Sequence, residues 1–277
     1  MMLLIRKSQM TQETWKMQIT ILPRTSRLHI ALLAIAAAAS LTPAPVFAKD
    51  LNMCIDPRFA KQGELKIFMH MMVVAAQNAG HTLNLTPMNW EECQETVRGG
   101  KYDGAVPASF NADRSEYMVY PQDAGKNPDS KWSLARINYV VVTPTGTNYQ
   151  YTGDPKTIPQ PVMLPEGYSI VSDLAKIAPS LQIKEMGSDD KTNLVRLLRG
   201  EKGSVVMMDR YADVLLERTM FKNKLKATSR GVVSKTYFMP FSRTSGLTNE
   251  QIQKIWDQIS LIKNDAKWMK TQMDALD

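Results

Sequence analysis

The chain has 277 residues, of which 44% are hydrophobic and 22% are charged, and its formal net charge is +7 at pH 7. Much of that charge lies before residue 49, where five basic residues stand against one acidic residue, so the remainder carries a formal charge of about +3. No later basic cluster has interleaved aromatic residues, which excludes the usual signature of a nucleic-acid-binding protein. The remainder is long enough for one large domain or two small ones with hydrophobic cores.

Residues 1–48 are predicted to be a cleaved secretory signal peptide. The apolar run Leu28–Leu41 has the length of a signal-peptide core and is shorter than the roughly 20 residues that span a bilayer. Cleavage is expected after Ala48, and Met17 offers an alternative start that would give a leader of ordinary length. An uncleaved N-terminal anchor is the alternative. Because the first cysteine is Cys54, a lipoprotein is not expected, and we predict a free periplasmic protein of a Gram-negative host.

After the leader, strand-like and helix-like segments alternate, which is typical of an α/β fold. Short apolar or alternating runs predict strands, and longer runs bounded by capping residues or glycine predict helices. In chain order, the expected strands are 51–55, 82–88, 102–108, 138–147, 161–164, 180–186 and 204–209. The expected helices are 64–80, 89–100, 168–178, 188–200, Asn249–Asn264 and Asp265–Met273. Two similar β-α-β-α-β blocks thus occupy 51–108 and 161–209.

The chain contains two cysteines, Cys54 and Cys93. In an oxidising compartment, such an even pair is expected to form a disulfide. A thiol pair for metal or redox chemistry is the alternative, but the spacing is not CxxC and no histidine lies near in the sequence. We therefore predict a disulfide between the first strand and the helix 89–100.

The run Met69-His70-Met71-Met72 raises the alternative of a copper site, because thioethers suit Cu(I). These residues lie within the helix 64–80, where consecutive side chains point in different directions. Methionine fills cores readily, so we interpret the run as packing. Only His70 and His81 follow the leader, and neither a metal nor another cofactor is expected.

Three motifs follow one another along the chain. The first is Trp90 and Cys93 followed by Val97-Arg98-Gly99-Gly100-Lys101-Tyr102-Asp103-Gly104. The second is Asn111-Ala112-Asp113-Arg114 with Tyr117 and Tyr120-Pro121, and the third is Leu198-Arg199-Gly200 with Ser204-Val205-Val206-Met207-Met208-Asp209. In their order and spacing they resemble the type II periplasmic solute-binding proteins of family 3, the polar amino-acid type. The resemblance covers nearly all of the chain after the leader.

The resemblance implies an α/β fold of two lobes, each a mixed sheet flanked by helices, joined by two hinge strands near Tyr139–Thr143 and Thr236–Ser242. Lobe 1 would comprise 49–141 and 237–277, and lobe 2 would comprise 142–236. A small ligand would bind between the lobes, which would close on it by a hinge motion. The implied partner is an ABC permease in the inner membrane, and the protein is expected to be a monomer that binds no nucleic acid.

The resemblance also assigns ligand-binding residues. Arg114 matches the family's arginine for the ligand carboxylate, a task that suits a guanidinium because it can donate two parallel hydrogen bonds. A salt bridge to Asp113 or Glu116 is the alternative for Arg114. Asp209 matches the family's acid for the ligand ammonium group, with a salt bridge to Arg210 or a helix cap as the alternative.

In lobe 2, Gly167, Tyr168 and Ser169 lie where a strand turns into a helix. Free backbone N–H groups at such a turn could hold an anion, although Ser169 could instead be only a helix cap. Asn111 stands where the family has threonine and still offers an amide to an anion. The candidates for cleft walls are Trp90, Phe110, Tyr139 and Tyr168, with core packing as the alternative for Trp90.

Together these expectations describe a binding protein, not an enzyme, that captures a small polar, carboxylate-bearing, amino-acid-like ligand for an ABC-type uptake system. A periplasmic dehydratase on the same fold is one alternative, with Glu166 or Asp209 as its general acid. An accessory that binds a ligand or partner for a periplasmic dehydrogenase or receptor is another. The loop after Cys54, which helps to choose the ligand in the family, keeps only Pro57 and Phe59, so the ligand stays unnamed.

Overall fold

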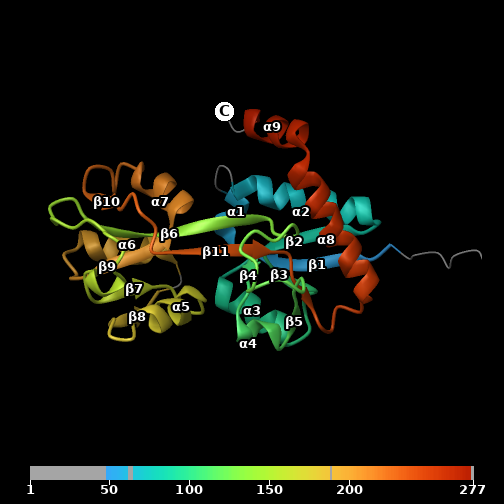
Figure 1. Cartoon of the computed structure of the whole chain (residues 1–277), viewed down its shortest axis with the longest axis horizontal. Coiled ribbons are helices and arrows are strands. Elements are labelled where there is room, and N and C mark those ends of the chain that lie inside the picture. Colours follow the sequence, from blue (N-terminus) through green and yellow to red (C-terminus); the bar gives the residue numbers. More distant parts are fainter. Residues whose placement is uncertain (1–47, 62–64, 188, 276–277) are drawn as a thin grey trace, which may run out of the picture. The chain divides into compact units, whose positions relative to one another are not determined.

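The structure is a computed structural model that describes residues 48–61, 65–187 and 189–275. The predicted signal peptide lies outside the described residues, apart from Ala48. The described part is a mixed α/β protein (Figure 1), as the sequence predicts. None of its helices is both long and apolar enough to cross a membrane.

We keep the names lobe 1 and lobe 2 for the predicted ranges, 49–141 with 237–277 and 142–236. The first of these ranges contains a three-stranded parallel sheet in the order β2-β1-β3. Its strands are β1 (Asp50–Ile55), β2 (Thr82–Pro87) and β3 (Gly104–Val106), and the helices between them are α1 (Pro57–Lys61), α2 (Leu65–Ala79) and α3 (Trp90–Arg98). Helix α2 packs against α8 (Asn249–Asn264), which begins with a capping box formed by Thr248 and Gln251. Leu51 and Met53 of β1 are fully buried, so this parallel sheet forms part of the core.

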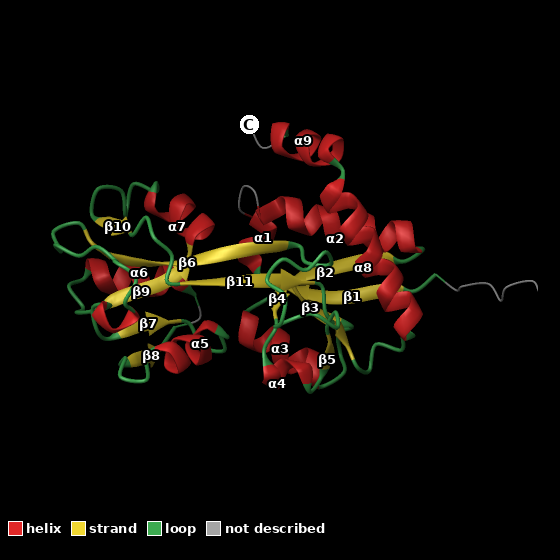
Figure 2. Cartoon of the chain, viewed as in Figure 1, coloured by secondary structure: helices red, strands yellow, loops and turns green. Residues whose placement is uncertain are grey.

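A second, seven-stranded sheet has the order β4-β11-β6-β9-β7-β8, with β10 paired to β6. Two of its strands, β6 (Ala135–Pro144) and β11 (Val233–Phe238), are antiparallel neighbours that lie side by side in Figure 2. The other strands are β4 (Ala108–Ser109), β7 (Val162–Leu164), β8 (Ile183–Glu185), β9 (Ser204–Met208) and β10 (Leu225–Ala227). Because β4 pairs with β11, this sheet continues from lobe 2 into lobe 1.

The remaining elements are shorter or lie outside these sheets. Helices α5 (Ile170–Ile177) and α6 (Asp190–Leu198) follow β7 and β8, and α7 (Asp209–Leu216) follows β9. The others are α4 (Ala112–Ser115), α9 (Ala266–Asp274), a single 3₁₀ turn at Pro155–Thr157, and the paired strands β5 (Met118–Val119) and β12 (Phe241–Ser242). Asn89, Asp189 and Asp265 accept hydrogen bonds from the first turns of α3, α6 and α9.

The predicted disulfide is confirmed. Cys54 of β1 and Cys93 of α3 are bonded, with their Cα atoms 5.6 Å apart, and both are fully buried. Trp90, Cys93 and Val97 form the buried face of α3 at helical spacing. The bond therefore joins this helix to the first strand of lobe 1.

The predicted pattern differs from the structure in several places, and helix α7 and the short strands β5 and β10 were not predicted. The strand expected at 102–108 is divided into β3 and β4 by Pro107, which has no N–H to donate to a neighbouring strand. The short helices α1 and α4 were not predicted, because four or five residues carry no helical periodicity. Both of these helices hold a buried arginine.

Candidate functional site

Arg114 lies in α4, a single helical turn that follows β4 after two residues. Asn111 is the N-cap of this turn, and its Oδ1 atom accepts hydrogen bonds from the backbone N–H groups of Asp113 and Arg114 at 2.8 and 3.3 Å. The side-chain amide of Asn111, which was predicted to bind the ligand, thus caps and orients the turn that carries Arg114. Helix α4 is short, and its direction depends on this cap.

The guanidinium of Arg114 is buried, and its partners come from both lobes. Its Nε donates to Oε1 of Gln94 at 2.8 Å, and its Nη1 donates to the carbonyl oxygen of Ser109 at 3.1 Å. Its Nη2 donates to the carbonyl oxygen of Gly167, in lobe 2, at 3.1 Å. Its Cζ lies 5.0 Å from the centroid of the Trp90 ring. All of these partners are neutral, and Arg114 forms no ion pair within the described ranges.

The turn Gly167-Tyr168-Ser169 lies opposite Arg114. Gly167 has φ +74°, in the left-handed region that favours glycine, and its carbonyl oxygen is the group that meets Arg114. Ser169 precedes α5 without capping it, and its hydroxyl is hydrogen-bonded instead to the hydroxyl of Ser109, at 2.8 Å. The lobe 2 turn predicted to face the ligand therefore contacts lobe 1 directly.

A second buried arginine, Arg58 of α1, was not predicted as a site residue. Its Nε donates to both carboxylate oxygens of Asp56 at 2.9 Å, and its Nη2 also contacts Asp56. Its Nη1 donates to Oδ2 of Asp190 in lobe 2 at 3.0 Å. Its Cζ lies 4.4 Å from the centroid of the Tyr168 ring, a cation–π contact. Burial, the largest cause, raises the pKa of Asp190 to about 6, although Arg58 lowers it.

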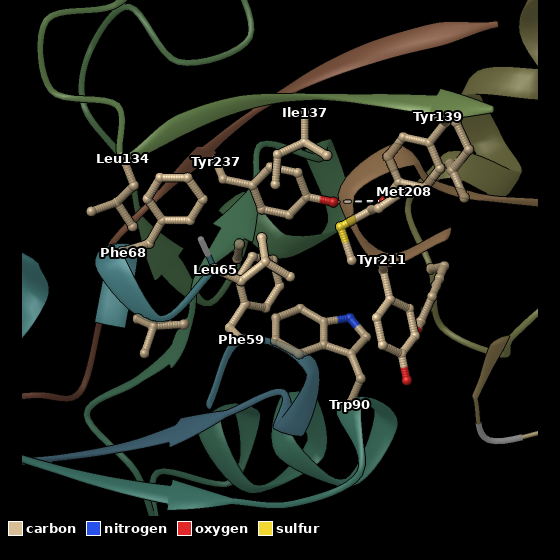
Figure 3. Close-up of a cluster of buried hydrophobic side chains, with 14 of the residues drawn as sticks. Phe59, Leu65, Phe68, Trp90, Leu134, Ile137, Tyr139, Met208, Tyr211 and Tyr237 are labelled. Carbon is tan, nitrogen blue, oxygen red and sulfur yellow. Dashed lines mark hydrogen bonds between the residues drawn. The ribbon is translucent and has the colours of Figure 1, made fainter. Parts of the chain in front are cut away.

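Aromatic side chains fill the space between these two arginines. Figure 3 shows the hydroxyls of Tyr139 and Tyr237 meeting, at 2.6 Å, with Phe59 and Trp90 in the same buried cluster. The ring centroids of Phe59 and Tyr237 are 5.7 Å apart. Burial raises the pKa of Tyr139 and of Tyr168 well above the ordinary value, so both phenols stay protonated. Only a cavity of about 20 Å³ remains here, lined by Asp56, Arg58, Phe59, Trp90, Pro107, Ser109, Arg114, Tyr139, Tyr168, Ser169 and Tyr237.

A larger cavity of about 680 Å³ lies on the other side of Ser109. Phe110 and Asn111 line it from lobe 1, and α5 and β11 supply most of the rest. Its charged lining residues are Lys126, Lys176, Lys235, Asp113 and Asp173. Lys235 is paired with Asp173, and burial lowers the pKa of this lysine despite the pair. Three cations against two anions leave an excess of positive charge around this cavity.

Asp209 lies away from these two cavities. It begins α7, and its Oδ2 accepts a hydrogen bond from Nδ2 of Asn138 at 3.0 Å while its Oδ1 accepts one from the backbone N–H of Arg210 at 2.7 Å. No contact joins Asp209 to Arg114 in the described part of the chain. Glu166, the other acid considered for catalysis, is exposed. The structure therefore brings Arg114, Tyr139, Tyr168, Ser169 and Gly167 together, places Phe110 and Asn111 beside the larger cavity, and leaves Asp209 apart.

The methionine-rich run lies on α2. Met71 and Met72 are fully buried, whereas His70 is exposed and its ring lies 5.7 Å from the ring of Trp268 in α9. Among the described residues, no group of three or more histidine, cysteine, aspartate or glutamate side chains is placed to hold a metal ion.

Solved structures of low sequence identity share this fold. A mutant of the protein ArgBP from T. maritima matches with a TM-score of 0.63 at 12% identity, over 82% of this chain and 94% of that chain. AbpA, an amino acid ABC transporter substrate-binding protein from Streptococcus pneumoniae bound to L-arginine, matches with a TM-score of 0.62 at 15% identity, over 82% and 94%. The periplasmic VFT2 domain of BvgS from Bordetella pertussis matches with a TM-score of 0.59 at 13% identity, over 82% and 93%.

These likenesses show the fold. The predicted resemblance to amino-acid-type substrate-binding proteins is thereby confirmed at the level of architecture, and the chain has the type II periplasmic-binding-protein fold. No protein-family model matches the sequence, and no curated protein matches it.

Proposed function

We propose that the chain is an exported binding protein that captures a small, carboxylate-bearing, amino-acid-like ligand between its lobes for an ABC-type uptake system. One observation carries the proposal. The buried guanidinium of Arg114 contacts lobe 2 with neutral partners only, so its charge is left without a counter-ion in the described part of the chain. A ligand carboxylate would supply that counter-ion and accept two hydrogen bonds from it.

Entry of a ligand into the space between Arg58 and Arg114 requires the lobes to separate. The cavity of about 20 Å³ between the two arginines has room for about one water molecule, so it holds no amino acid. A separate cavity of about 340 Å³ borders Arg114 as well and is lined in part by Gln94, Gly167 and Ser169. Bending at β6 and β11 would part Arg114 from Gly167 and Ser109 from Ser169, which frees donors on both lobes. A ligand that contacts both lobes would then favour the closed form, because those contacts exist only there.

The larger cavity supports an anionic ligand. Ser109 and Asn111, which precede Arg114 in the chain, line this cavity. The lining contains three lysines and two aspartates. An excess of positive charge at the mouth of a site raises the local concentration of anions and speeds their association. Phe110 and Ile177 add apolar surface for the body of an organic acid.

A thermal-shift screen over amino acids, dicarboxylates and small peptides tests the proposal. We expect at least one carboxylate to raise the unfolding temperature of the purified protein. The shift should vanish in Arg114→Ala and persist in Arg136→Ala, because Arg136 is an exposed residue of β6 paired with Asp129. Trp90 lies beside Arg114, so the hit should also change tryptophan fluorescence in the wild type. A shift that survives Arg114→Ala would refute the site.

A second function is favoured by the filled space between Arg58 and Arg114. A protein that keeps this fold as a sensor or accessory, without importing a solute, has no need of an empty ligand site. The absence of any hit in the screen, together with X-ray scattering profiles that no compound alters, would favour this role. An Arg114-dependent hit would contradict it.

A further inference from the structure

Arg58 is held in a site built for a cation. Its guanidinium contacts the carboxylates of Asp56 and Asp190 and lies 4.4 Å from the ring centroid of Tyr168 and 5.8 Å from that of Tyr211. Two carboxylates and two aromatic faces are the groups that recognise a guanidinium in binding sites. Three of these four groups, Asp190, Tyr168 and Tyr211, belong to lobe 2, whereas Arg58 belongs to lobe 1.

The acceptors of this site are deeply buried. Asp56 is 4% exposed and Asp190 is fully buried, and Oδ1 of Asp190 has no hydrogen-bond partner among the described residues. A buried carboxylate without a cation is costly, because water no longer solvates it. These two carboxylates therefore require a cation, and Arg58 supplies it from within the chain.

Arg58 also occupies space that a ligand would otherwise use. It lines the cavity of about 20 Å³ together with Arg114, Trp90 and Ser169, so the two arginines border the same small space between the lobes. A ligand carboxylate at Arg114 would place the rest of the ligand next to this space. The rest of the ligand would then face the guanidinium of Arg58, whose charge is already neutralised by Asp56 and Asp190.

We propose that Arg58 is a built-in occupant of a guanidinium subsite formed by Asp56, Asp190 and Tyr168, and that it determines specificity by excluding ligands with a positively charged side chain. The exclusion rests on the proposed function, since it supposes that a ligand enters between the lobes. The subsite itself does not. Truncation of Arg58 opens the subsite, which then takes a free guanidinium compound of the same shape as the lost group.

The test is chemical rescue of Arg58→Ala. Methylguanidinium should raise the unfolding temperature of this variant saturably, by about 3 to 6 °C at ten times its dissociation constant. Methylammonium at equal concentration should produce a much smaller shift, because it lacks the planar fork of donors. Neither compound should stabilise the wild type or Arg136→Ala, and Arg58→Ala combined with Asp190→Asn should lose most of the rescue.

If Arg58→Ala does not fold alone, it is refolded with each of the two compounds. A higher yield of folded protein with methylguanidinium than with methylammonium then supports the subsite. No saturable rescue, or equal rescue by both cations, would overturn the subsite. L-Arginine should stabilise Arg58→Ala and leave the wild type unchanged, and stabilisation of the wild type would overturn the exclusion. Rescue in a protein that binds no compound of the ligand screen would refute the proposed function while the subsite stands.

Discussion

Arg114 and Arg58 are both buried residues of lobe 1 that reach lobe 2, yet their partners differ in charge. Arg114 donates to an amide, carbonyl and hydroxyl oxygens, whereas Arg58 lies between the carboxylates of Asp56 and Asp190. A guanidinium with neutral partners still attracts an anion, and one between two carboxylates does not. Burial alone therefore does not identify an arginine that binds a ligand, and the charge of its partners does.

The comparison predicts that Arg58→Ala causes the largest loss of stability. The substitution leaves the carboxylates of Asp56 and Asp190 buried without a cation, which costs about 3–5 kcal/mol. Urea unfolding measures this loss, with Arg136→Ala as the control that should change the free energy of unfolding by less than about 0.5 kcal/mol. A loss for Arg58→Ala no larger than that of the control would remove the distinction between the two arginines.

Arg114→Ala should cost less stability and abolish ligand binding. It removes the charged donor from Oε1 of Gln94 and from the carbonyl oxygens of Ser109 and Gly167, although these two carbonyl oxygens keep hydrogen bonds from Tyr120 and Gln94. We expect a loss of about 2–3 kcal/mol in urea unfolding. Calorimetric titration with a hit from the screen should detect no binding to the folded variant. If Arg114→Ala binds normally while Arg58→Ala does not, the roles of the two arginines are the reverse of those argued above.

Asp190→Asn should change how stability depends on pH. Because the folded state raises the pKa of Asp190 to about 6, from 3.8, the folded protein binds a proton more readily than the unfolded chain. This contribution stabilises the protein at low pH and is lost as the pH rises through 6. Between about pH 7.5 and about pH 4.5, the free energy of unfolding of the wild type should rise relative to that of Asp190→Asn by about 2 kcal/mol.

Urea unfolding of both proteins at matched pH values measures that difference. The asparagine keeps an oxygen that accepts from Arg58, so Asp190→Asn should fold at neutral pH. A pH-independent difference between the two proteins would show that Asp190 keeps an ordinary pKa, and that Arg58 compensates its burial fully.

The smallest predicted effect is at Asn111. Asn111→Ala removes the N-cap of α4 and should cost about 1 kcal/mol in urea unfolding, whereas Asn111→Ser should recover most of that loss. Since α4 carries Arg114, weaker ligand binding should accompany the loss in Asn111→Ala and be restored in Asn111→Ser. Weak binding by a fully stable Asn111→Ser would instead mean that the amide contacts the ligand.

Much of the fold could be predicted because its signals are local. The alternation in 82–88 predicted a strand, and Asn89 as N-cap with Gly99-Gly100 as the stop predicted the helix that became α3. A single turn such as α4 has too few residues for a periodic pattern. Pro107 is visible in the sequence, but the pairing of β4 with β11 instead of β1 depends on a strand more than 120 residues away, which no local window contains.

The candidate site could be predicted in part for the same reason. Arg114 lies in a motif whose order and spacing are visible in the sequence. Gly167 and Ser169 lie where a predicted strand turns into a predicted helix. Arg58 carries no such signal, because its partner Asp190 is 132 residues away and a lone arginine after a strand is usually solvated. A weak hint was available in Asp56, an acid two residues before Arg58.

The disulfide has a consequence for both arginines. Cys54 is two residues before Asp56, the partner of Arg58, and Cys93 precedes Gln94, which accepts from Arg114. One covalent bond thus anchors the two segments that position both guanidinium groups. A thiol reductant that cleaves it would loosen the two sites together, so that ligand affinity and the pH response of Asp190 would become functions of the redox state of the solution.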